Sequence, residues 1–144
     1  MVEISFQCRP PQDQERELVA KSLKEHTERA IGMRISNEAF GMHAYDGTKM
    51  VGSVIGKIFF NWLHIDLFWV EADYRKKGIG SHLMNSSLEY ATKAGLSGIE
   101  VWTQSWQAPG FYKKLGYEEF AAIDDFTPGR KRHAFRKYIS KTST

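Results

Sequence analysis

One continuous stretch, from Leu63 to Ala91, sets strong limits on the fold of this chain. Its first part, Leu63 to Glu71, is almost wholly apolar, which predicts a strand covered on both faces at the centre of a sheet. A short basic turn with two glycines, Arg75 to Gly80, follows it. Apolar residues then recur at helical spacing from Ile79 to Ala91 and predict a helix with a buried stripe. A strand, a turn and a crossover helix in this order predict an α/β layer fold.

The turn before this helix is a candidate anion site. Main-chain N–H groups at the start of a helix have no partner within the helix, and the helix dipole is positive there. Glycines allow the main chain to approach a ligand closely, so the turn suits a pyrophosphate. Basic turns with glycine also precede helices that bind nothing, so the rest of the chain has to decide. The residues assigned to the turn are Arg75, Lys76, Lys77, Gly78, Ile79, Gly80 and Ser81.

The remaining hydrophobic pattern predicts six more strands and two more helices. Apolar residues alternate from Val2 to Cys8, which predicts a first strand. Pro10-Pro11 then opens a helix that runs to Ile31, and Asp46-Gly47 predicts a hairpin turn. The order along the chain is therefore β-α-β-β-β-α-β-α-β-β, in a single domain over residues 1–144. The other expected elements are strands 38–45, 50–60, 99–103, 117–123 and 134–139, and a helix over 109–115.

Composition limits the classes of function. With 144 residues and a net charge of +3, the chain is mildly basic. No apolar run approaches the ~20 residues that cross a bilayer, and the first residues lack a signal-peptide pattern, so no membrane partner is expected. A lone cysteine, Cys8, favours the reducing cytoplasm. The basic clusters at 75–77 and 130–132 are short for a nucleic-acid surface, and the scattered histidines predict no metal site.

Two motifs in register identify a family. Arg75-x-x-Gly78-x-Gly80 lies at the strand-to-helix turn, and the run Phe111-Tyr112-Lys113-Lys114-Leu115-Gly116-Tyr117 lies on the helix after the next strand. Together with the order of elements, they resemble the GNAT family of N-acetyltransferases, with its R/Q-x-x-G-x-G/A loop and its F-Y-x-K-x-G-F/Y helix. The resemblance implies an α/β fold with a central mixed, mostly antiparallel sheet and helices on both faces.

The resemblance also implies an acetyl-CoA site. The main-chain N–H groups of residues 75–81 would hold the pyrophosphate. The pantetheine arm would pair with the strand at Phe68 to Val70, which commonly carries a bulge that separates it from the next strand. An N–H near Val70 would hold the thioester oxygen as charge develops on it. This chain departs from the family at Ala72, where proline is common, and at Ser105, where asparagine is common; the serine hydroxyl reaches less far toward CoA.

The catalytic groups follow from the same resemblance. Tyr112 matches the usual proton donor to the CoA thiolate. Phe111 and Leu115 share a helix face, which would pack on the sheet while Tyr112 points toward the cleft. Glu71, at the end of the strand, is the first candidate for the general base. Asp66 is the second, because it is expected beside His64 and on the same strand face as Phe68, and bulk water is the third. The other histidines are expected to be surface or core residues.

The predicted function is transfer of an acetyl group from acetyl-CoA to a primary amine of a small molecule or peptide. The alternative is a module that binds acetyl-CoA without turnover. Homodimers are frequent in the family, so a homodimer is one possibility, and the sequence leaves the oligomeric state open.

Overall fold

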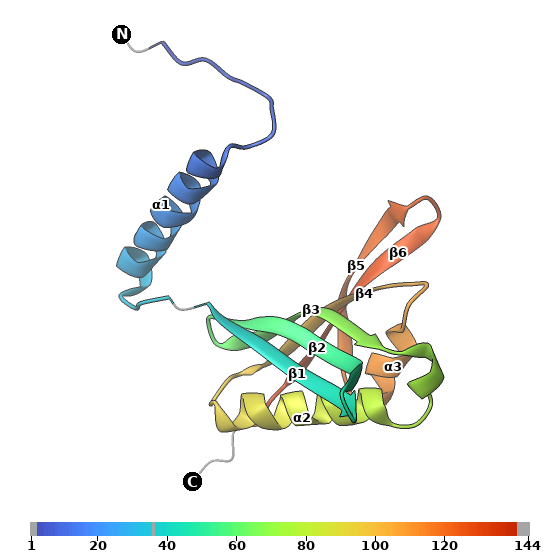
Figure 1. The fold of residues 1–144 in the computed structure, drawn as a ribbon. Helices are drawn as coiled ribbons and strands as arrows, with labels where there is room; N and C mark the ends of the chain where they lie inside the picture. The colour runs from blue at the N-terminus through green and yellow to red at the C-terminus, as the bar shows by residue number, and fades with distance from the viewer. Residues whose placement is uncertain (1–2, 36, 141–144) are drawn as a thin grey trace. The chain divides into compact units, whose positions relative to one another are not determined.

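The computed structural model describes residues 3–35 and 37–140, which form two units, before and after residue 36 (Figure 1). Each unit is described by itself. The N-terminal unit contains α1, Asp13–Ile31, which ends at Gly32 in the left-handed conformation (φ 69°). The chain before it contradicts the expected first strand: Glu3 to Cys8 form no ladder, and Phe6 is 93% exposed. Alternating apolar residues make a strand only where a neighbouring strand supplies hydrogen bonds. The expected first residue of that strand, Val2, lies outside the described residues.

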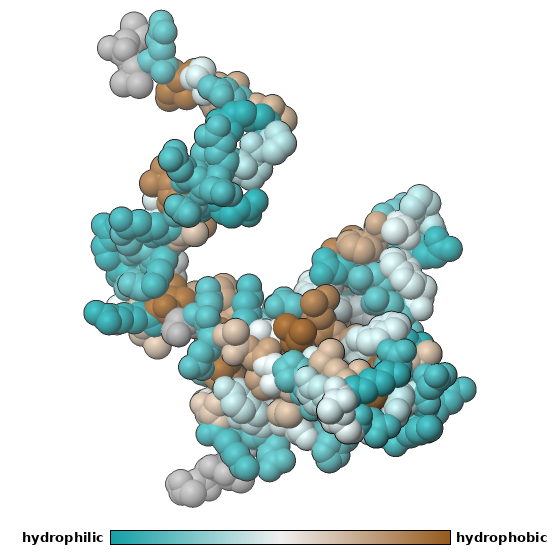
Figure 2. Space-filling view, in the orientation of Figure 1, coloured by the Kyte–Doolittle hydropathy of each residue, from teal (hydrophilic) through white to brown (hydrophobic). Residues whose placement is uncertain are grey.

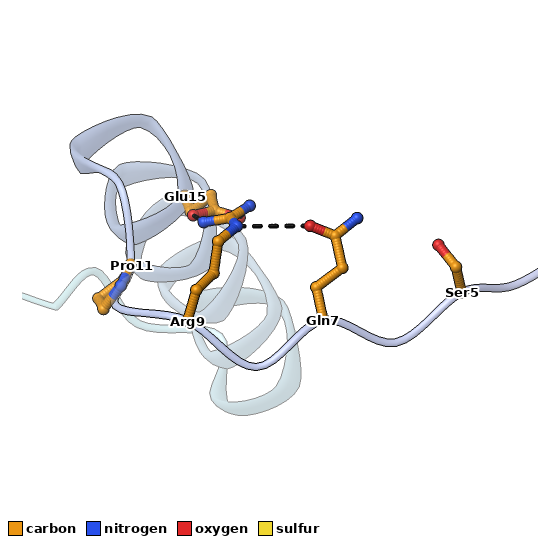
Figure 3. Close-up of a pocket in the computed structure, with 5 residues that line it drawn as sticks. All are labelled: Ser5, Gln7, Arg9, Pro11 and Glu15. Atoms are coloured by element: carbon orange, nitrogen blue, oxygen red, sulfur yellow. Dashed lines mark hydrogen bonds and ion pairs between the residues drawn. The ribbon is translucent and has the colours of Figure 1, made fainter.

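An ion pair ties the segment before α1 to the first turn of the helix. Arg9 Nη1 lies 2.6 Å from Glu15 Oε1, and its Nε donates to Gln7 Oε1 (Figure 3). The Glu15 carboxylate also accepts a hydrogen bond from the Gln12 N–H at 2.8 Å. The shallow depression around this pair is lined by Ser5, Gln7, Arg9, Pro11 and Glu15. Its polar groups are arranged as they are because Glu15 caps the start of the helix.

The second unit is built on one six-stranded sheet in the order β1-β2-β3-β4-β6-β5 (Figure 1). Its neighbours are antiparallel except β3 and β4, which are parallel. Gly47 (φ 60°) makes the predicted hairpin turn between the first two strands. The elements are β1 Glu38–Asp46, β2 Lys49–Phe59, β3 Trp62–Val70, the short 3-10 helix η1 Ala72–Tyr74, α2 Ile79–Lys93, β4 Gly98–Gln104, α3 Pro109–Lys114, β5 Glu118–Thr127 and β6 Arg130–Tyr138.

The core of this unit lies between the sheet and its two helices. Leu83, Met84 and Ala91 of α2 pack on one face of the sheet. The helix approaches so closely that a Cβ on Gly52 of β2 would lie 3.1 Å from a methyl group of Leu83. The aromatic ring of Tyr112, from α3, packs against the same face at Phe135. Both helices of this unit therefore cover one face of the sheet, and burying that face stabilises it.

The opposite face of the sheet carries charged and aromatic side chains of alternate strand residues. Apolar residues also gather over β2 and β3 in Figure 2, and the cross-strand partners Ile55 and Leu67 in these strands are 41% and 65% exposed. The predicted fold class is confirmed: a mixed α/β unit on a mostly antiparallel sheet. Within residues 3–35 and 37–140, no helix combines the length and apolar character that a membrane span requires.

Candidate active site

The loop between β3 and α2 has a backbone that few sequences adopt. Lys76 and Gly78 both have positive φ angles, 61° and 84°. Gly78 is the N-cap residue of α2 and has no side chain to satisfy the first N–H groups of the helix. Arg75, in this loop, anchors it to the end of β3. Its Nε donates to the Val70 carbonyl oxygen at 2.9 Å, and its guanidinium lies 4.4 Å from the centre of the Trp69 ring.

The start of α2 offers unpaired hydrogen-bond donors. The first main-chain bond of the helix runs from His82 N to Gly78 O at 3.0 Å. In the described chain, no group accepts a hydrogen bond from the N–H of Ile79, Gly80 or Ser81. A Cβ on Gly80 would lie 3.2 Å from the Phe68 ring, so a glycine lets the helix start against that ring. Three free donors beside Lys76 and Lys77 fit the diphosphate of a nucleotide-like ligand.

The sheet opens next to this loop. Parallel pairing between β3 and β4 covers only four positions and ends at Ile65 and Val101. The β2–β3 register shifts at the same place: Gly56 pairs with Ile65 and Ile55 with Leu67, which leaves Asp66 as a bulge. The bulge implied by the family resemblance is therefore confirmed. It also overturns the prediction that Phe68 shares a face with Asp66 and His64, because one extra residue moves the following side chains to the other face.

Main-chain groups of β3 point into this opening. Glu71 N donates to Val51 O at 2.8 Å, and Gly52 pairs with Val70. Hydrogen-bonded and non-hydrogen-bonded pairs alternate along an antiparallel ladder, so the N–H groups of Val70 and Phe68 face away from β2. They face the side where β4 has separated, and an amide-bearing arm would find donors and acceptors there.

The Tyr112 ring is packed among aromatic rings. It stacks on Phe135 with centroids 5.7 Å apart and meets the edges of Phe68 and Tyr117 at 6.4 and 5.9 Å. The residue is only 3% exposed, and burial raises the pKa of its phenol above the ordinary 10.0. The helix-face prediction is confirmed for Phe111 and Leu115, which pack against the core. It is wrong for Tyr112, which is more buried than Phe111 because α3 turns this ring toward the sheet.

The hydroxyl groups of Tyr112 and Tyr117 differ in their surroundings. The Tyr117 hydroxyl is fully enclosed and has no partner in the described chain. The Tyr112 hydroxyl is not among the enclosed atoms, and it also makes no hydrogen bond within the described chain. Burial and the neighbouring Tyr112 raise the pKa of Tyr117. The Tyr112 hydroxyl is therefore the one that an incoming group can reach.

The candidate bases lie at two places on β3. Glu71 directly follows β3 and precedes η1, beside the loop. Asp66, in the bulge, lies 3.0 Å from His64 Nε2, while His64 Nδ1 lies 2.6 Å from Glu100 Oε1 on β4. The predicted Asp66–His64 neighbourhood is present. Glu100 joins it through the parallel register that pairs it with His64, which the sequence alone does not reveal.

Ser105 and the basic turn of the last hairpin lie beyond the end of β4. Ser105 exchanges two hydrogen bonds with Lys131: its N–H donates to the carbonyl oxygen at 2.9 Å, and its hydroxyl accepts from the N–H at 3.2 Å. The Ser105 hydroxyl therefore joins two strands. Arg132 follows Lys131 on β6, and its guanidinium lies 4.6 Å from the centre of the Trp102 ring. Sequence reasoning missed this contact, which a prediction of the β4–β6 register would have suggested.

Comparison with known proteins gives one answer. A model of the Acetyltransferase (GNAT) family matches residues 2–117. The blasticidin-S acetyltransferase of Streptomyces morookaense is 39% identical over 92 residues, which are 63% of this chain and 68% of that protein.

Solved structures agree with the family model. An acetyltransferase from Bacillus cereus ATCC 14579 has a TM-score of 0.84 at 28% identity, over 93% of this chain and 98% of that one. A protein of Bacillus anthracis str. Ames, described as a streptothricin acetyltransferase and solved in complex with acetyl coenzyme A, shares the fold with a TM-score of 0.64 at 20% identity, over 72% of this chain and 64% of that one. This chain therefore belongs to the GNAT family of acetyltransferases, which take their acetyl group from acetyl-CoA.

Proposed function

We propose that this protein transfers an acetyl group from acetyl-CoA to a primary amine of a small molecule or a peptide. One observation carries the proposal: the Tyr112 hydroxyl is free of partners in the described chain, and its ring rests on Phe68, which lines both the opened edge of β3 and the start of α2. A proton donor, free main-chain donors and an anion site thus meet at one end of the sheet.

The binding groups come from one short segment. The N–H groups of Ile79, Gly80 and Ser81, with Lys76 and Lys77, hold the diphosphate of acetyl-CoA. The main chain of Phe68 and Val70 pairs with the pantetheine arm in the opening between β3 and β4. Once bound, acetyl-CoA supplies the acetyl group as a thioester. Because Ser105 already bonds Lys131 with its hydroxyl, we assign it a weak contact with CoA.

The protons move through side chains of this chain. The Val70 N–H donates to the carbonyl oxygen on which negative charge develops. As the nitrogen–carbon bond forms and the carbon–sulfur bond breaks, Glu71 takes the proton from the acceptor nitrogen and Tyr112 donates its own to the sulfur. Asp66 is the second candidate for the base. Burial of the phenol keeps it protonated, and a thiolate that leaves in the same enclosed place is equally disfavoured as an anion, so both pKa values rise together.

The relatives define which acceptors should be tried first. One relative is a blasticidin-S acetyltransferase, and a structural neighbour from Escherichia coli is a ribosomal-protein-S18-alanine N-acetyltransferase. Purified protein offered acetyl-CoA and a panel of antibiotics, polyamines, amino acids and short peptides should release CoA thiol, detected with a thiol-reactive dye, with a matching mass increase of the acceptor. Acetyl-CoA binding without turnover on any amine would instead favour a sensor module.

We further propose that residues 1–144 act as one catalytic domain in the cytoplasm. Its lone cysteine supports the location, and the family model that spans both sides of residue 36 supports the single domain. A homodimer stays a prediction, which size-exclusion chromatography with light scattering would test.

A further inference from the structure

One basic side chain of the last hairpin is held in place without a counter-ion. Arg132, on β6, lies with its guanidinium 4.6 Å from the centre of the Trp102 ring and 5.2 Å from that of Phe126. Its Nε is enclosed and has no acceptor in the described chain. Among residues 37–140, its guanidinium makes no hydrogen bond and no ion pair. A half-buried cation costs free energy unless an anion meets it.

The acidic residues of this hairpin are already engaged elsewhere. Glu118 pairs with Arg136 and Glu119 with His133. Asp124 lies 3.4 Å from the Lys131 ammonium, and Asp125 accepts a hydrogen bond from the Gly129 N–H at 3.2 Å. The acidic residues of the hairpin therefore leave the Arg132 guanidinium without a carboxylate. Gln104, opposite Arg132 on β4, has an enclosed side-chain oxygen that also has no partner in the described chain, and this neutral group would not balance the charge.

A second arginine on the same strand gives the contrast. Arg136 also lies over two rings, 5.0 Å from Phe120 and 5.3 Å from Tyr138. Its Nε donates to Glu118 Oε1 at 2.8 Å, so its charge is neutralised inside the hairpin. The two arginines share strand, face and aromatic support, and differ in whether an anion is present.

The position of Arg132 relates it to the opening of the sheet. Val101 is the last residue of β4 that pairs with β3, so Trp102 borders the opening. Glu100 and Trp102 lie on the same face, two residues apart, and Glu100 contacts His64, which contacts Asp66. One end of this face thus carries two carboxylates around one imidazole, and the other end carries the Arg132 guanidinium. The Cα atoms of Glu100 and Trp102, the β4 residues that contact the two ends, are about 7 Å apart, because each strand residue advances about 3.3 Å.

We propose that Arg132 is a specificity site for a carboxylate on the acceptor, so that the preferred acceptor carries both an amine and an acid. This inference rests on the proposed acetyltransferase function and names its substrate class. The amine end of the acceptor lies toward the β3–β4 opening, past Asp66, and the acid end meets the planar fork of the guanidinium on the Trp102 ring. Because the two ends are held by different strands, an acceptor that reaches both carries its amine and its acid at opposite ends of a short chain.

The test measures turnover of acetyl-CoA with three primary amines of equal chain length: 5-aminopentanoate, pentylamine and 1,5-diaminopentane. The wild-type protein should use 5-aminopentanoate with a kcat/KM at least about tenfold above that of either other amine, mainly through a lower KM. Arg132→Gln should reduce the ratio between 5-aminopentanoate and pentylamine to about one. Arg132→Glu should reverse the preference, so that 1,5-diaminopentane becomes the better acceptor.

Arg136→Gln is the matched control, because it removes an arginine from the same strand whose charge is already paired. It should keep the wild-type ratio of kcat/KM values. Calorimetric binding of acetyl-CoA, with an unchanged dissociation constant in all three variants, verifies that they are folded.

The outcomes separate the two proposals. Turnover of the amines with a ratio that Arg132→Gln does not change overturns the carboxylate site and leaves the acetyltransferase function standing. The same ratio change in Arg136→Gln also overturns it, since the effect would then come from net charge. Binding of acetyl-CoA without turnover of any amine, in this set or in the wider panel, overturns both.

Discussion

Arg75 Nε donates a hydrogen bond to the carbonyl oxygen of Val70 at 2.9 Å and thereby ties the loop proposed to hold acetyl-CoA to the end of β3. The first arginine of the loop motif thus acts on the main chain of the protein, and its ring contact with Trp69 holds it there. In this arrangement the side chain positions the loop, while the N–H groups behind it remain free for the diphosphate.

Arg75→Gln should therefore weaken acetyl-CoA binding through the position of the loop. We expect KM for acetyl-CoA to rise about tenfold, because a misplaced loop loses several donors at once. Steady-state kinetics at saturating acceptor would measure it. Lys93→Gln, at the far end of α2, is the control for charge. Equal rises in both variants would contradict a positioning role for Arg75.

Gly78→Ala should affect both stability and binding. The residue has φ 84°, where a Cβ is strained, so we expect unfolding to become easier by about 1 kcal/mol. Because Gly78 is the N-cap of α2, KM for acetyl-CoA should rise as well. Gly95→Ala, at the other end of the same helix with φ 74° and open space around it, should show the stability loss alone. Urea unfolding and kinetics on both variants decide between strain and site geometry.

Tyr112→Phe should change the catalytic rate, whereas Tyr117→Phe should change the stability. Removing the accessible hydroxyl of Tyr112 should lower kcat about a hundredfold with little change in stability. Removing the enclosed, unpartnered hydroxyl of Tyr117 should keep kcat and raise the free energy of unfolding by about 1 kcal/mol. A loss of kcat in Tyr117→Phe equal to that in Tyr112→Phe would argue against proton donation by Tyr112.

Alkaline pH should destabilise the protein through these two phenols. Burial raises the pKa of both Tyr112 and Tyr117 in the folded state, whereas an unfolded tyrosine ionises near about pH 10. Their contribution is therefore fully present below about pH 10 and is lost as the pH rises above it. Urea midpoints from about pH 8 to about pH 11 should fall more steeply for the wild type than for Tyr117→Phe. Parallel curves would mean that the Tyr117 phenol does not contribute.

The two candidate bases can be separated by kinetics. If Glu71 accepts the proton, Glu71→Gln should lower kcat by about a hundredfold and Asp66→Asn by much less. If Asp66 accepts it, the order reverses, and Glu100→Gln should produce a smaller loss because Glu100 holds the other nitrogen of His64. Measuring kcat of each variant at several pH values, with Tyr112 kept in all of them, distinguishes the loss of a base from the loss of a substrate contact. Full activity in both carboxylate variants would favour bulk water as the proton acceptor.

Local signals in the sequence predicted most of the elements. The Asp46-Gly47 turn and the glycine-bearing start of α2 each have a local physical cause, and each is present. The apolar run of β3 also forms the predicted central strand, but Leu67 and Trp69 are 65% and 61% exposed, so the prediction that both of its faces are covered is wrong within this unit. The prediction of a first strand over Val2 to Cys8 was wrong because alternating apolar residues do not show whether a neighbouring strand is present to pair with. The side of Phe68 was predicted wrongly because a bulge at Asp66 depends on the neighbouring strand.

Contacts between distant segments could not be read from the sequence. His64 and Glu100 meet through a parallel register, and Arg132 reaches Trp102 through an antiparallel one. Neither register is encoded within the strand that carries the side chain. The motifs predicted the loop after β3 and Tyr112 as parts of the site, while the proposed acceptor side could be described only from the assembled sheet.

The four-position pairing between β3 and β4 also affects how the sheet folds and which of its amides exchange with solvent. It joins two antiparallel blocks: β1-β2-β3, which consists of two hairpins, and β4-β6-β5, in which the β5–β6 hairpin pairs with β4 across the intervening α3. The hairpins can form early, because short loops close quickly, whereas the parallel seam joins segments that α2 separates and forms later. Leu63, Ile65, Ile99 and Val101 on this seam are at most 2% exposed, so their amides should exchange slowly with deuterium. The amides of Phe68 and Val70, beyond the end of the seam, should exchange faster, and a ligand arm paired with them would slow that exchange.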